Sequence, residues 1–289
     1  MFTSQDVMKL RQVTGVGMMD CKKALEATNG DMDEAIKFLR EKGMATAAKK
    51  ADRIASEGIV AAYKNSSAGV LVEVNCETDF VARGDQFKSF VESIAKFIAE
   101  NDVKDVDSVV AAKTAELNEA ISKIGEKISI RRFAKYSAAN TVVDSYIHMG
   151  GKIGVLVEAS ANTPADVIHD VALQIAAAKP SYVSKTEVPQ AEIDSEKEIL
   201  KAQALNDPNP KPINIIEKMV EGRINKYYKE VCLLEQLFVK DGEKTIAQYI
   251  KATNTEIIRF TRFEMGEGLE KKQDTMAAEV QAQLDKMKK

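Results

Sequence analysis

An internal repeat restricts the folds open to this chain. The segment Gly-Val-Leu-Val-Glu occurs at residues 69–73 and again at 154–158, and each copy follows an apolar run that ends in a tyrosine, Tyr63 or Tyr146. Continuous Val/Leu runs of this length are typical of buried strands. An amphipathic helix pattern follows each copy, with apolar positions at Phe87, Val91, Ile94, Ala95 and Ile98 and at Val167, Val171, Ile175 and Ala178. We therefore predict an α+β protein with two related strand-strand-helix core subdomains.

The prolines mark a segment inserted into the second subdomain. All six lie between Pro164 and Pro212. Because proline cannot continue a helix, Pro208, Pro210 and Pro212 indicate a turn between two helices. Apolar residues recur on both sides of it, at Ile193, Leu200 and Leu205 and at Ile216, Met219 and Val220. We predict an inserted antiparallel helical hairpin, of coiled-coil type, over residues 187–228.

Residues 1–54 have the pattern of a compact three-helix module. The predicted elements are a helix capped by Ser4 that ends at Gln12, a turn over 14–17, a helix over 18–28 and a helix from Asp31 to Gly43. The residues expected in its core are Val7, Leu10, Cys21, Leu25, Ile36 and Leu39. This arrangement leaves Arg11, Met18, Met19 and Lys22 for a surface. The two methionines suit either a partly buried position or, beside the turn, a partner surface.

These patterns divide the chain into five units. They are the helical module over 1–54, the first core subdomain over 55–140, the second core subdomain over 141–186 and 229–263, the hairpin over 187–228, and a C-terminal helical module over 264–289. A helix near 109–127 and a strand over 128–133 connect the two subdomains, and a helix over 245–251 and a strand over 257–260 complete the second. The last unit contains a polar helix over 276–289 with apolar residues Met276, Val280, Leu284 and Met287.

Composition argues against several function classes. The 41 Lys and Arg residues and 44 Asp and Glu residues give a net charge of -3, which provides no basic field for nucleic acid. Only two histidines and three widely spaced cysteines are present, without the motifs of a serine hydrolase, a zinc protease or a phosphate loop. We therefore expect no enzyme, metal site or cofactor. The first ten residues lack a signal-peptide core and no segment is apolar enough to span a membrane, so we expect a cytoplasmic protein.

The segment over 77–81, Glu-Thr-Asp-Phe-Val, directly follows the first repeat strand. Glu77 and Asp79 could suggest a metal or acid-base pair, but neither a histidine nor a third ligand is near them in the sequence. Phe80 could cap the core of its subdomain or anchor a partner, and the pattern leaves both alternatives open.

The two histidines are weaker candidates. His148 precedes the hairpin-turn sequence Met-Gly-Gly-Lys and is more typical of a surface residue than of a catalyst. The segment over 150–152 lacks the Ser or Thr and the glycine spacing of a phosphate loop. His169, beside Asp170 on a predicted helix, is expected to be structural.

Five segments carry a family resemblance: residues 14–25, 77–82, 148–154, 217–223 and 262–268. They read Thr-Gly-Val-Gly-Met-Met-Asp-Cys-Lys-Lys-Ala-Leu, Glu-Thr-Asp-Phe-Val-Ala, His-Met-Gly-Gly-Lys-Ile-Gly, Glu-Lys-Met-Val-Glu-Gly-Arg and Arg-Phe-Glu-Met-Gly-Glu-Gly. With these motifs the chain resembles the bacterial elongation factor Ts family over nearly its whole length.

The resemblance implies a guanine-nucleotide exchange factor that acts by binding and has no chemical active site. It would bind elongation factor Tu in its GDP form, disturb the magnesium and phosphate site, and release GDP so that GTP can bind. GDP, GTP and magnesium would belong to the partner, and this chain would need no cofactor. In the family, the N-terminal module and the first core subdomain contact the partner's GTPase domain, and the second core subdomain faces its third domain.

The family's contact residues can be placed on this sequence. Asp79 and Phe80, flanked by Thr78 and Val81, match a wedge into the GTPase. The other matches are Arg11, Met18, Met19 and Lys22 in a ubiquitin-associated-like (UBA-like) module, Ile124 and Gly125 in a core loop, and His148 on the far side.

Two positions depart from the family pattern. Gly84 stands where Asn is common and is expected to alter the capping of the following helix, and Leu237 stands where Pro is usual. The sequence leaves open whether the hairpin mediates homodimerisation within a 2:2 complex. The alternative function is an adaptor or chaperone that binds helices or peptides without affecting nucleotide; an enzyme with an unfamiliar site and a nucleic-acid binder are more distant.

Overall fold

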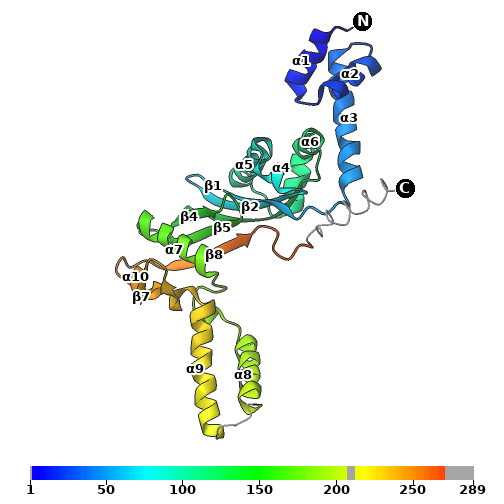
Figure 1. Ribbon diagram of the computed structural model, residues 1–289. Coiled ribbons are helices and arrows are strands. Elements are labelled where there is room, and N and C mark those ends of the chain that lie inside the picture. Colours follow the sequence, from blue (N-terminus) through cyan, green and yellow to red (C-terminus); the bar gives the residue numbers. More distant parts are fainter. Residues whose placement is uncertain (1, 207–211, 271–289) are drawn as a thin grey trace, which may run out of the picture.

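The structure is a computed structural model that describes residues 2–206 and 212–270. Helices and antiparallel sheets occupy separate stretches of the described chain, which confirms the α+β class. Figure 1 shows two central sheets that lie between the N-terminal helices and a pair of long helices. The helix predicted over 276–289 lies outside the described residues.

Three helices form the N-terminal module: α1 (Ser4–Thr14), α2 (Met18–Ala27) and α3 (Met32–Lys50). The prediction that Ser4 caps α1 is wrong. Thr3 is the N-cap, since its hydroxyl accepts the N–H of Asp6 while the Asp6 carboxylate accepts the N–H of Thr3. The third helix also runs beyond Gly43, because the alanines that follow favour a helix and this half packs against α6 (Val106–Ile124). Of the predicted core, Val7, Leu10, Cys21, Leu25 and Leu39 are buried and Ile36 packs against them partly exposed.

Two three-stranded antiparallel sheets form the centre of the molecule. The first contains β1 (Glu57–Lys64), β2 (Ala68–Cys76) and β3 (Ser129–Ser137), and the second contains β4 (Thr141–His148), β5 (Ile153–Ser160) and β8 (Ile257–Glu264), each in that order. Helices α5 (Asp85–Glu100) and α6 pack on the first sheet, and α7 (Ala165–Ala178) packs on the second. The two copies of the repeat thus occupy the two central strands, β2 and β5.

A second repeat, not recognised from the sequence, occupies the third strand of each sheet. Residues 130–136 of β3 read Ile-Arg-Arg-Phe-Ala-Lys-Tyr, and residues 257–263 of β8 read Ile-Ile-Arg-Phe-Thr-Arg-Phe. Both strands extend beyond the predicted ends at 133 and 260, because β2 and β5 offer backbone partners along their length. Each sheet also has a β-bulge at the same place in the repeat, after Glu73 and after Glu158.

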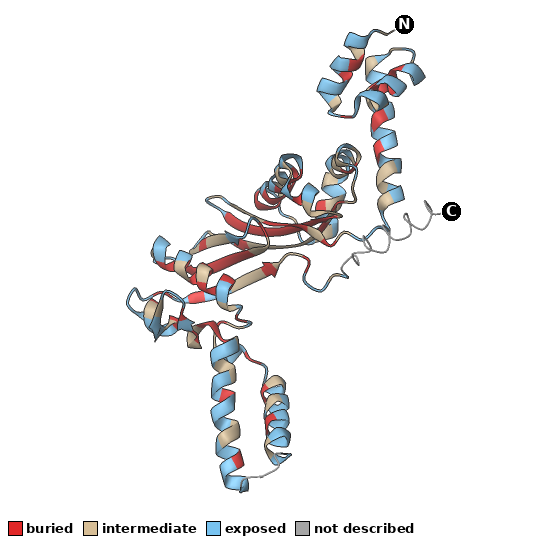
Figure 2. Cartoon of the chain, in the orientation of Figure 1, coloured by how far each residue is buried: buried red, intermediate tan, exposed pale blue. Residues whose placement is uncertain are grey.

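The inner faces of the two sheets pack against each other. Strand alternation directs Leu71 and Leu156 of the repeat into this interface, while the valines on either side face the helices. The repeat glycines lie at the closest approach: a Cβ on Gly154 would lie 2.4 Å from Cγ1 of Val60. The interface is completed by Val60, Tyr136, Val143 and Phe263. Figure 2 shows the buried strands that result.

The second subdomain carries the long helical pair. Helices α8 (Gln190–Leu205) and α9 (Ile213–Val231) lie side by side and bury Ile193, Leu200, Ile216 and Ile224. The turn over 207–211, with two of its predicted prolines, lies outside the described residues. The remaining elements are η1 (Lys185–Glu187), η2 (Leu233–Glu235), β6 (Leu237–Phe238), β7 (Asp241–Thr245) and α10 (Ile246–Lys251).

We expect Gly154→Ala to lower the free energy of unfolding by about 1–3 kcal/mol, the usual cost of overpacking. The added methyl group would meet the side chains of Val60, Leu71 and Ile147. Chemical denaturation of the full chain measures the change. Gly222→Ala is the matched control, because a Cβ there meets nothing within 4 Å and alanine favours the helix α9. Equal destabilisation by both substitutions would contradict the packing role of Gly154.

Candidate functional site

Phe80 is the most exposed large apolar side chain of the described residues. It lies in α4 (Asp79–Arg83), a single helical turn that begins shortly after β2 ends. Thr78 is the N-cap of this turn, and its hydroxyl accepts the N–H of Val81 at 3.4 Å. The Phe80 side chain is 85% exposed, so the alternative that it caps the core is wrong. An apolar ring in this position is available to a partner.

A carboxylate from another loop holds the turn that carries Phe80. Glu126 accepts the N–H groups of Glu77 and Thr78, both at 3.0 Å, and the Thr78 hydroxyl at 2.6 Å. In return, the Glu77 carboxylate accepts the N–H of Lys127 at 2.7 Å. Hydrogen bonds to carboxylates are among the stronger ones in proteins. The backbone before Phe80 is therefore fixed against the loop that follows α6.

The carboxylates of Glu77 and Asp79 are directed to separate partners. Glu77 also pairs with Arg53 at 3.2 Å, whereas Asp79 pairs with Arg83 at 2.8 Å within α4. In the part of the chain that the structure describes, no group of three or more His, Cys, Asp or Glu side chains is arranged to hold a metal ion. Glu77 has a structural role in the turn, and Asp79 braces α4.

The structure brings Ile124 and Gly125 next to the Phe80 turn, because both directly precede Glu126. Gly125 is the C-cap of α6 and has φ at 84°, a backbone conformation that favours glycine. Its carbonyl accepts a hydrogen bond from the ammonium group of Lys50, at the end of α3. Beside this loop is a groove of about 260 Å³ lined by Gly15, Gln86, Glu119, Ala120, Lys123 and Ile124. The N-terminal module, α6 and the start of α5 therefore share one surface.

The four predicted contact residues of the N-terminal module all face solvent. Arg11 and Lys22 are exposed, and Met18 and Met19 are 40% and 64% exposed. Met19 is thus largely exposed, whereas Met18 keeps the partly buried position that is one of the two alternatives. They begin α2, shortly after Gly15, which lines the groove beside α6.

His148 is exposed at the end of β4 on the second sheet. The turn that follows contains three residues with positive φ, Met149, Gly150 and Gly151, which reverses the chain into β5. The N–H of Val60 on β1 donates to the carbonyl of Gly151 at 2.8 Å, so the turn is attached to the first sheet.

The His148 turn and the Phe80 turn leave the two sheets at the same end. Lys152, after the His148 turn, pairs with Glu57 at the start of β1 at 2.9 Å. Glu57 lies opposite Cys76, the last residue of β2, in the register of the first sheet. Two loops that are distant in the sequence are thus connected through the beginning of β1.

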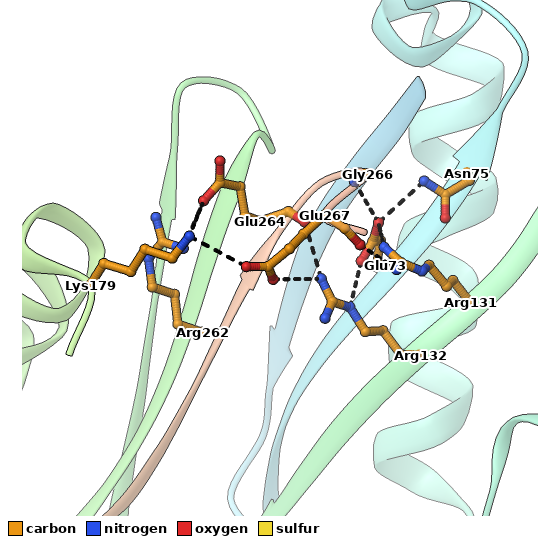
Figure 3. Close-up of polar contacts among 9 residues, drawn as sticks. All are labelled: Glu73, Asn75, Arg131, Arg132, Lys179, Arg262, Glu264, Gly266 and Glu267. Carbon is orange, nitrogen blue, oxygen red and sulfur yellow. Dashed lines mark hydrogen bonds and ion pairs between the residues drawn. The ribbon is translucent and has the colours of Figure 1, made fainter. Parts of the chain in front are cut away.

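A buried ionic network reinforces this end of the molecule (Figure 3). Glu73 on β2 has no solvent exposure, and it accepts the Nε–H of Arg132 at 2.6 Å and Nη1–H of Arg131 at 2.9 Å. The N–H of Gly266, in the turn after β8, donates to the same carboxylate at 2.8 Å, and Nδ2 of Asn75 donates at 3.2 Å. Glu73 therefore ties both sheets together a few residues before Phe80.

The turn after β8 is also held from the second subdomain. Lys179, which follows α7, lies 3.3 Å from Glu264 and 3.4 Å from Glu267. Arg132 reaches Glu267 at 3.5 Å, so the two subdomains share this acidic pair. The motif over 262–268, one of the five segments of the family resemblance, thus has a structural role at the junction of the sheets.

The environment of Glu73 sets its pKa in a definite direction. Burial raises the pKa, but the hydrogen bonds from Gly266, Arg132 and Arg131 outweigh burial and lower it below its ordinary value. A lowered pKa in the folded state means that ionised Glu73 stabilises the fold above the unfolded-state pKa. This contribution is lost as the pH falls through the folded-state pKa.

The two departures from the family pattern lie in different places. Gly84 separates α4 from α5, and as the N-cap of α5 it makes no side-chain hydrogen bond to the helix. Gly84 is thus at the cap of the helix after Phe80, and the change in capping relative to an Asn stays a prediction. Leu237 is 59% exposed in β6, on the second subdomain.

Comparison with known proteins agrees with these features. The family model described as Elongation factor TS matches residues 77–267, from the Phe80 turn to the turn after β8. Elongation factor Ts of Clostridium perfringens strain 13 is 49% identical, with 97% of this chain and 98% of that protein covered. Elongation factor Ts of Clostridium botulinum strain Eklund 17B is 48% identical, with coverage of 99% and 100%, and that of Clostridium novyi strain NT is 47% identical, with 99% of each.

The family model and these relatives place the chain, with its two-sheet core, among the translation elongation factors. Within that class it belongs to the elongation factor Ts family. The described helices include none with the length and apolar character needed to cross a membrane.

We expect Glu73→Gln to lower the free energy of unfolding by about 3 kcal/mol near pH 7, because it leaves two guanidinium groups without their buried carboxylate. The difference from wild type should begin to shrink as the pH falls below about 4.5, the ordinary pKa of Glu, and should be lost as the pH falls through the lower folded-state pKa of Glu73. Denaturation curves between pH 3 and pH 7 measure this. A difference that stays constant over that range would contradict the ionic role of Glu73.

We expect Glu126→Ala to speed amide hydrogen exchange at residues 77 and 78 by about tenfold or more, because their N–H groups lose their acceptor. Exchange measured by NMR resolves these residues from the interior of α5. Glu116→Ala is the control, since that carboxylate on α6 pairs with Lys113 at the surface. Unchanged exchange in Glu126→Ala would mean that the carboxylate does not hold the turn.

Proposed function

We propose that this protein is the guanine-nucleotide exchange factor of elongation factor Tu in translation elongation. It binds the GDP form of that GTPase, disturbs the magnesium and phosphate site, and promotes GDP release so that GTP can bind. The family membership supports this function, and the observation that carries it is Phe80, an exposed apolar ring on a turn fixed by Glu126. GDP, GTP and magnesium belong to the partner in this proposal, and the exchange takes place in the cytoplasm.

Exchange requires only that this protein bind the nucleotide-free partner more tightly than the nucleotide-bound partner. A GTPase holds Mg²⁺ through the nucleotide phosphates, a P-loop hydroxyl and an aspartate. An apolar ring inserted beside these groups separates them from the ion and weakens the whole site. Phe80 is the wedge, and Asp79 supports it through its ion pair with Arg83.

The size of the effect shows that Phe80 does not act alone. Burial of one Phe side chain provides roughly 1.5–3 kcal/mol. A thousandfold weakening of the nucleotide needs about 4 kcal/mol, at about 1.36 kcal/mol for each factor of ten. Other contacts supply the remainder. We assign it to Arg11, Met18, Met19 and Lys22 in the N-terminal module, to Thr78, Val81, Ile124 and Gly125 around the wedge, and to His148.

These contacts divide between two parts of the partner. We assign the N-terminal UBA-like module and the first subdomain to the GTPase domain, since Gly15 of the module and Ile124, next to the loop that holds the Phe80 turn, line the same groove. We assign His148 to the third domain of elongation factor Tu. Because both turns leave the sheets at the same end, one elongated partner can reach both.

Release of a fluorescent GDP analogue from elongation factor Tu tests the proposal. The full chain, at a concentration far below that of the GTPase, should accelerate release with many turnovers per molecule. By reciprocity, GDP must weaken binding of this protein by the same factor by which the protein weakens GDP binding. A folded sample that binds the GTPase without accelerating release would support the adaptor alternative and overturn the exchange function.

We expect Phe80→Ala to reduce the acceleration of GDP release by about 10- to 100-fold, since it removes about 1.5–3 kcal/mol of apolar burial in the complex. Its unfolding midpoint should match wild type, because the ring is exposed in the free protein. Leu237→Ala is the control, as an exposed apolar side chain on β6 outside the proposed contacts. If Phe80→Ala exchanges nucleotide at the wild-type rate, Phe80 is not the wedge.

A further inference from the structure

Both histidines of this chain meet at one tyrosine. On β4, Asp144, Tyr146 and His148 lie two residues apart and so share one face of the strand. Helix α7 places His169 over that face. The ring of Tyr146 lies 5.8 Å from each imidazole ring, tilted at 34° to His148 and edge-on at 89° to His169.

A continuous series of contacts runs through this cluster from the first sheet to His148. Lys64 at the end of β1 pairs with Asp144 at 2.7 Å, and Asp144 in turn lies 2.9 Å from Nδ1 of His169. His169 contacts the Tyr146 ring, and the Tyr146 hydroxyl lies 2.9 Å from Nδ1 of His148. Asp144 is well shielded, with its side chain only 13% exposed, whereas the side chains of Lys64 and His169 are about half exposed. Lys64 and His148, at the two ends of the series, are both exposed residues.

We propose that Tyr146 is a positioning residue for His148 in the complex with the GTPase. This inference rests on the proposed function, in which His148 is a partner contact. The Tyr146 hydroxyl donates its hydrogen to Nδ1, which leaves the hydrogen of the neutral imidazole on Nε2. His148 then presents Nε2–H to an acceptor on the partner, a backbone carbonyl or a carboxylate.

The same contact reduces the entropy lost on binding. An exposed imidazole samples several rotamers, and a partner that needs one of them must immobilise the ring. The hydrogen bond to Tyr146 and the contact between the two rings restrict His148 before the partner arrives. Loss of this restriction should weaken binding by about 3- to 10-fold, the usual effect of one side chain that must be ordered.

A double-mutant cycle separates positioning from a general structural effect. The full chain is prepared as Tyr146→Phe, His148→Ala and the double variant, and the affinity for nucleotide-free elongation factor Tu is measured by titration. Tyr146→Phe removes only the hydroxyl and should bind about 3- to 10-fold more weakly. His148→Ala should weaken binding at least as much, and Tyr146→Phe should have no further effect in the His148→Ala background.

Tyr249→Phe is the matched control. The Tyr249 hydroxyl donates to Asp170 on α7 at 2.9 Å, so this variant loses a similar hydrogen bond in the same subdomain. It should bind the GTPase like wild type. Thermal unfolding midpoints of all variants show whether a change in affinity follows a change in stability.

The identity of the presented nitrogen has its own test. The amide nitrogen of Gln lies near the position of Nε2 in His, whereas that of Asn lies near Nδ1. His148→Gln should therefore retain more affinity than His148→Asn. Equal affinity of the two variants would overturn the assignment of Nε2–H as the donor.

Three outcomes would overturn the positioning role. They are an additive effect of Tyr146→Phe in the His148→Ala background, an equal loss in Tyr249→Phe, and wild-type affinity of Tyr146→Phe when His148→Ala binds weakly. If His148→Ala itself binds like wild type, the proposed contact fails and the inference fails with it. Failure of the wild-type chain to release GDP from the GTPase would instead reject the exchange function.

Discussion

The close approach of the two sheets is the constraint on which the rest of the structure depends. Gly69 and Gly154 begin the two copies of the repeat, and a side chain at either position would collide with the opposite sheet. Because these glycines let the inner faces meet, Leu71 and Leu156 are fully buried between the sheets while the neighbouring valines remain available to the helices. The Phe80 turn and the His148 turn are positioned relative to each other by this contact, since each is an extension of a strand in one of the two sheets.

The repeat glutamates show how duplicated units diverge. Glu73 and Glu158 each pair with the arginine directly opposite in the third strand, Arg132 and Arg259. Each arginine also stacks on an aromatic ring of the other sheet, Arg132 on Phe263 and Arg259 on Tyr136. Glu158 gains one further partner, the Thr141 hydroxyl, whereas Glu73 gains three, from Arg131, Asn75 and the turn after β8. The unit with the denser network is the one that carries the exposed Phe80.

Much of this architecture follows from local sequence patterns, and the exceptions have physical reasons. The repeat and the helix periodicity are sufficient to predict the α+β class, the two central strands and the long helical pair. The second repeat, in the third strand of each sheet, is present in the sequence. Its arginine and lysine residues make it unlike the continuous apolar pattern of a buried strand, so it was not recognised. The position of Phe80 remained open because a helix of one turn has no periodicity from which a buried face can be recognised. The role of Glu126 depends on hydrogen bonds to Glu77 and Thr78, which precede it by 49 and 48 positions in the sequence. No local pattern encodes contacts over such a separation.

An exposed Phe on a single helical turn needs external support to remain in one position. A helix as short as α4 is not stable by its own hydrogen bonds, because helix formation begins with an unfavourable nucleation step. Here two sets of contacts before the turn provide the support: Glu126 fixes the backbone at Thr78, and the buried network around Glu73 fixes the strand from which the turn emerges. The backbone that leads into Phe80 is thus held in place before the protein meets a partner. In the proposed exchange function this support matters as much as the apolar area of Phe80, since binding energy that would otherwise order the turn can be used to displace the ion and the nucleotide.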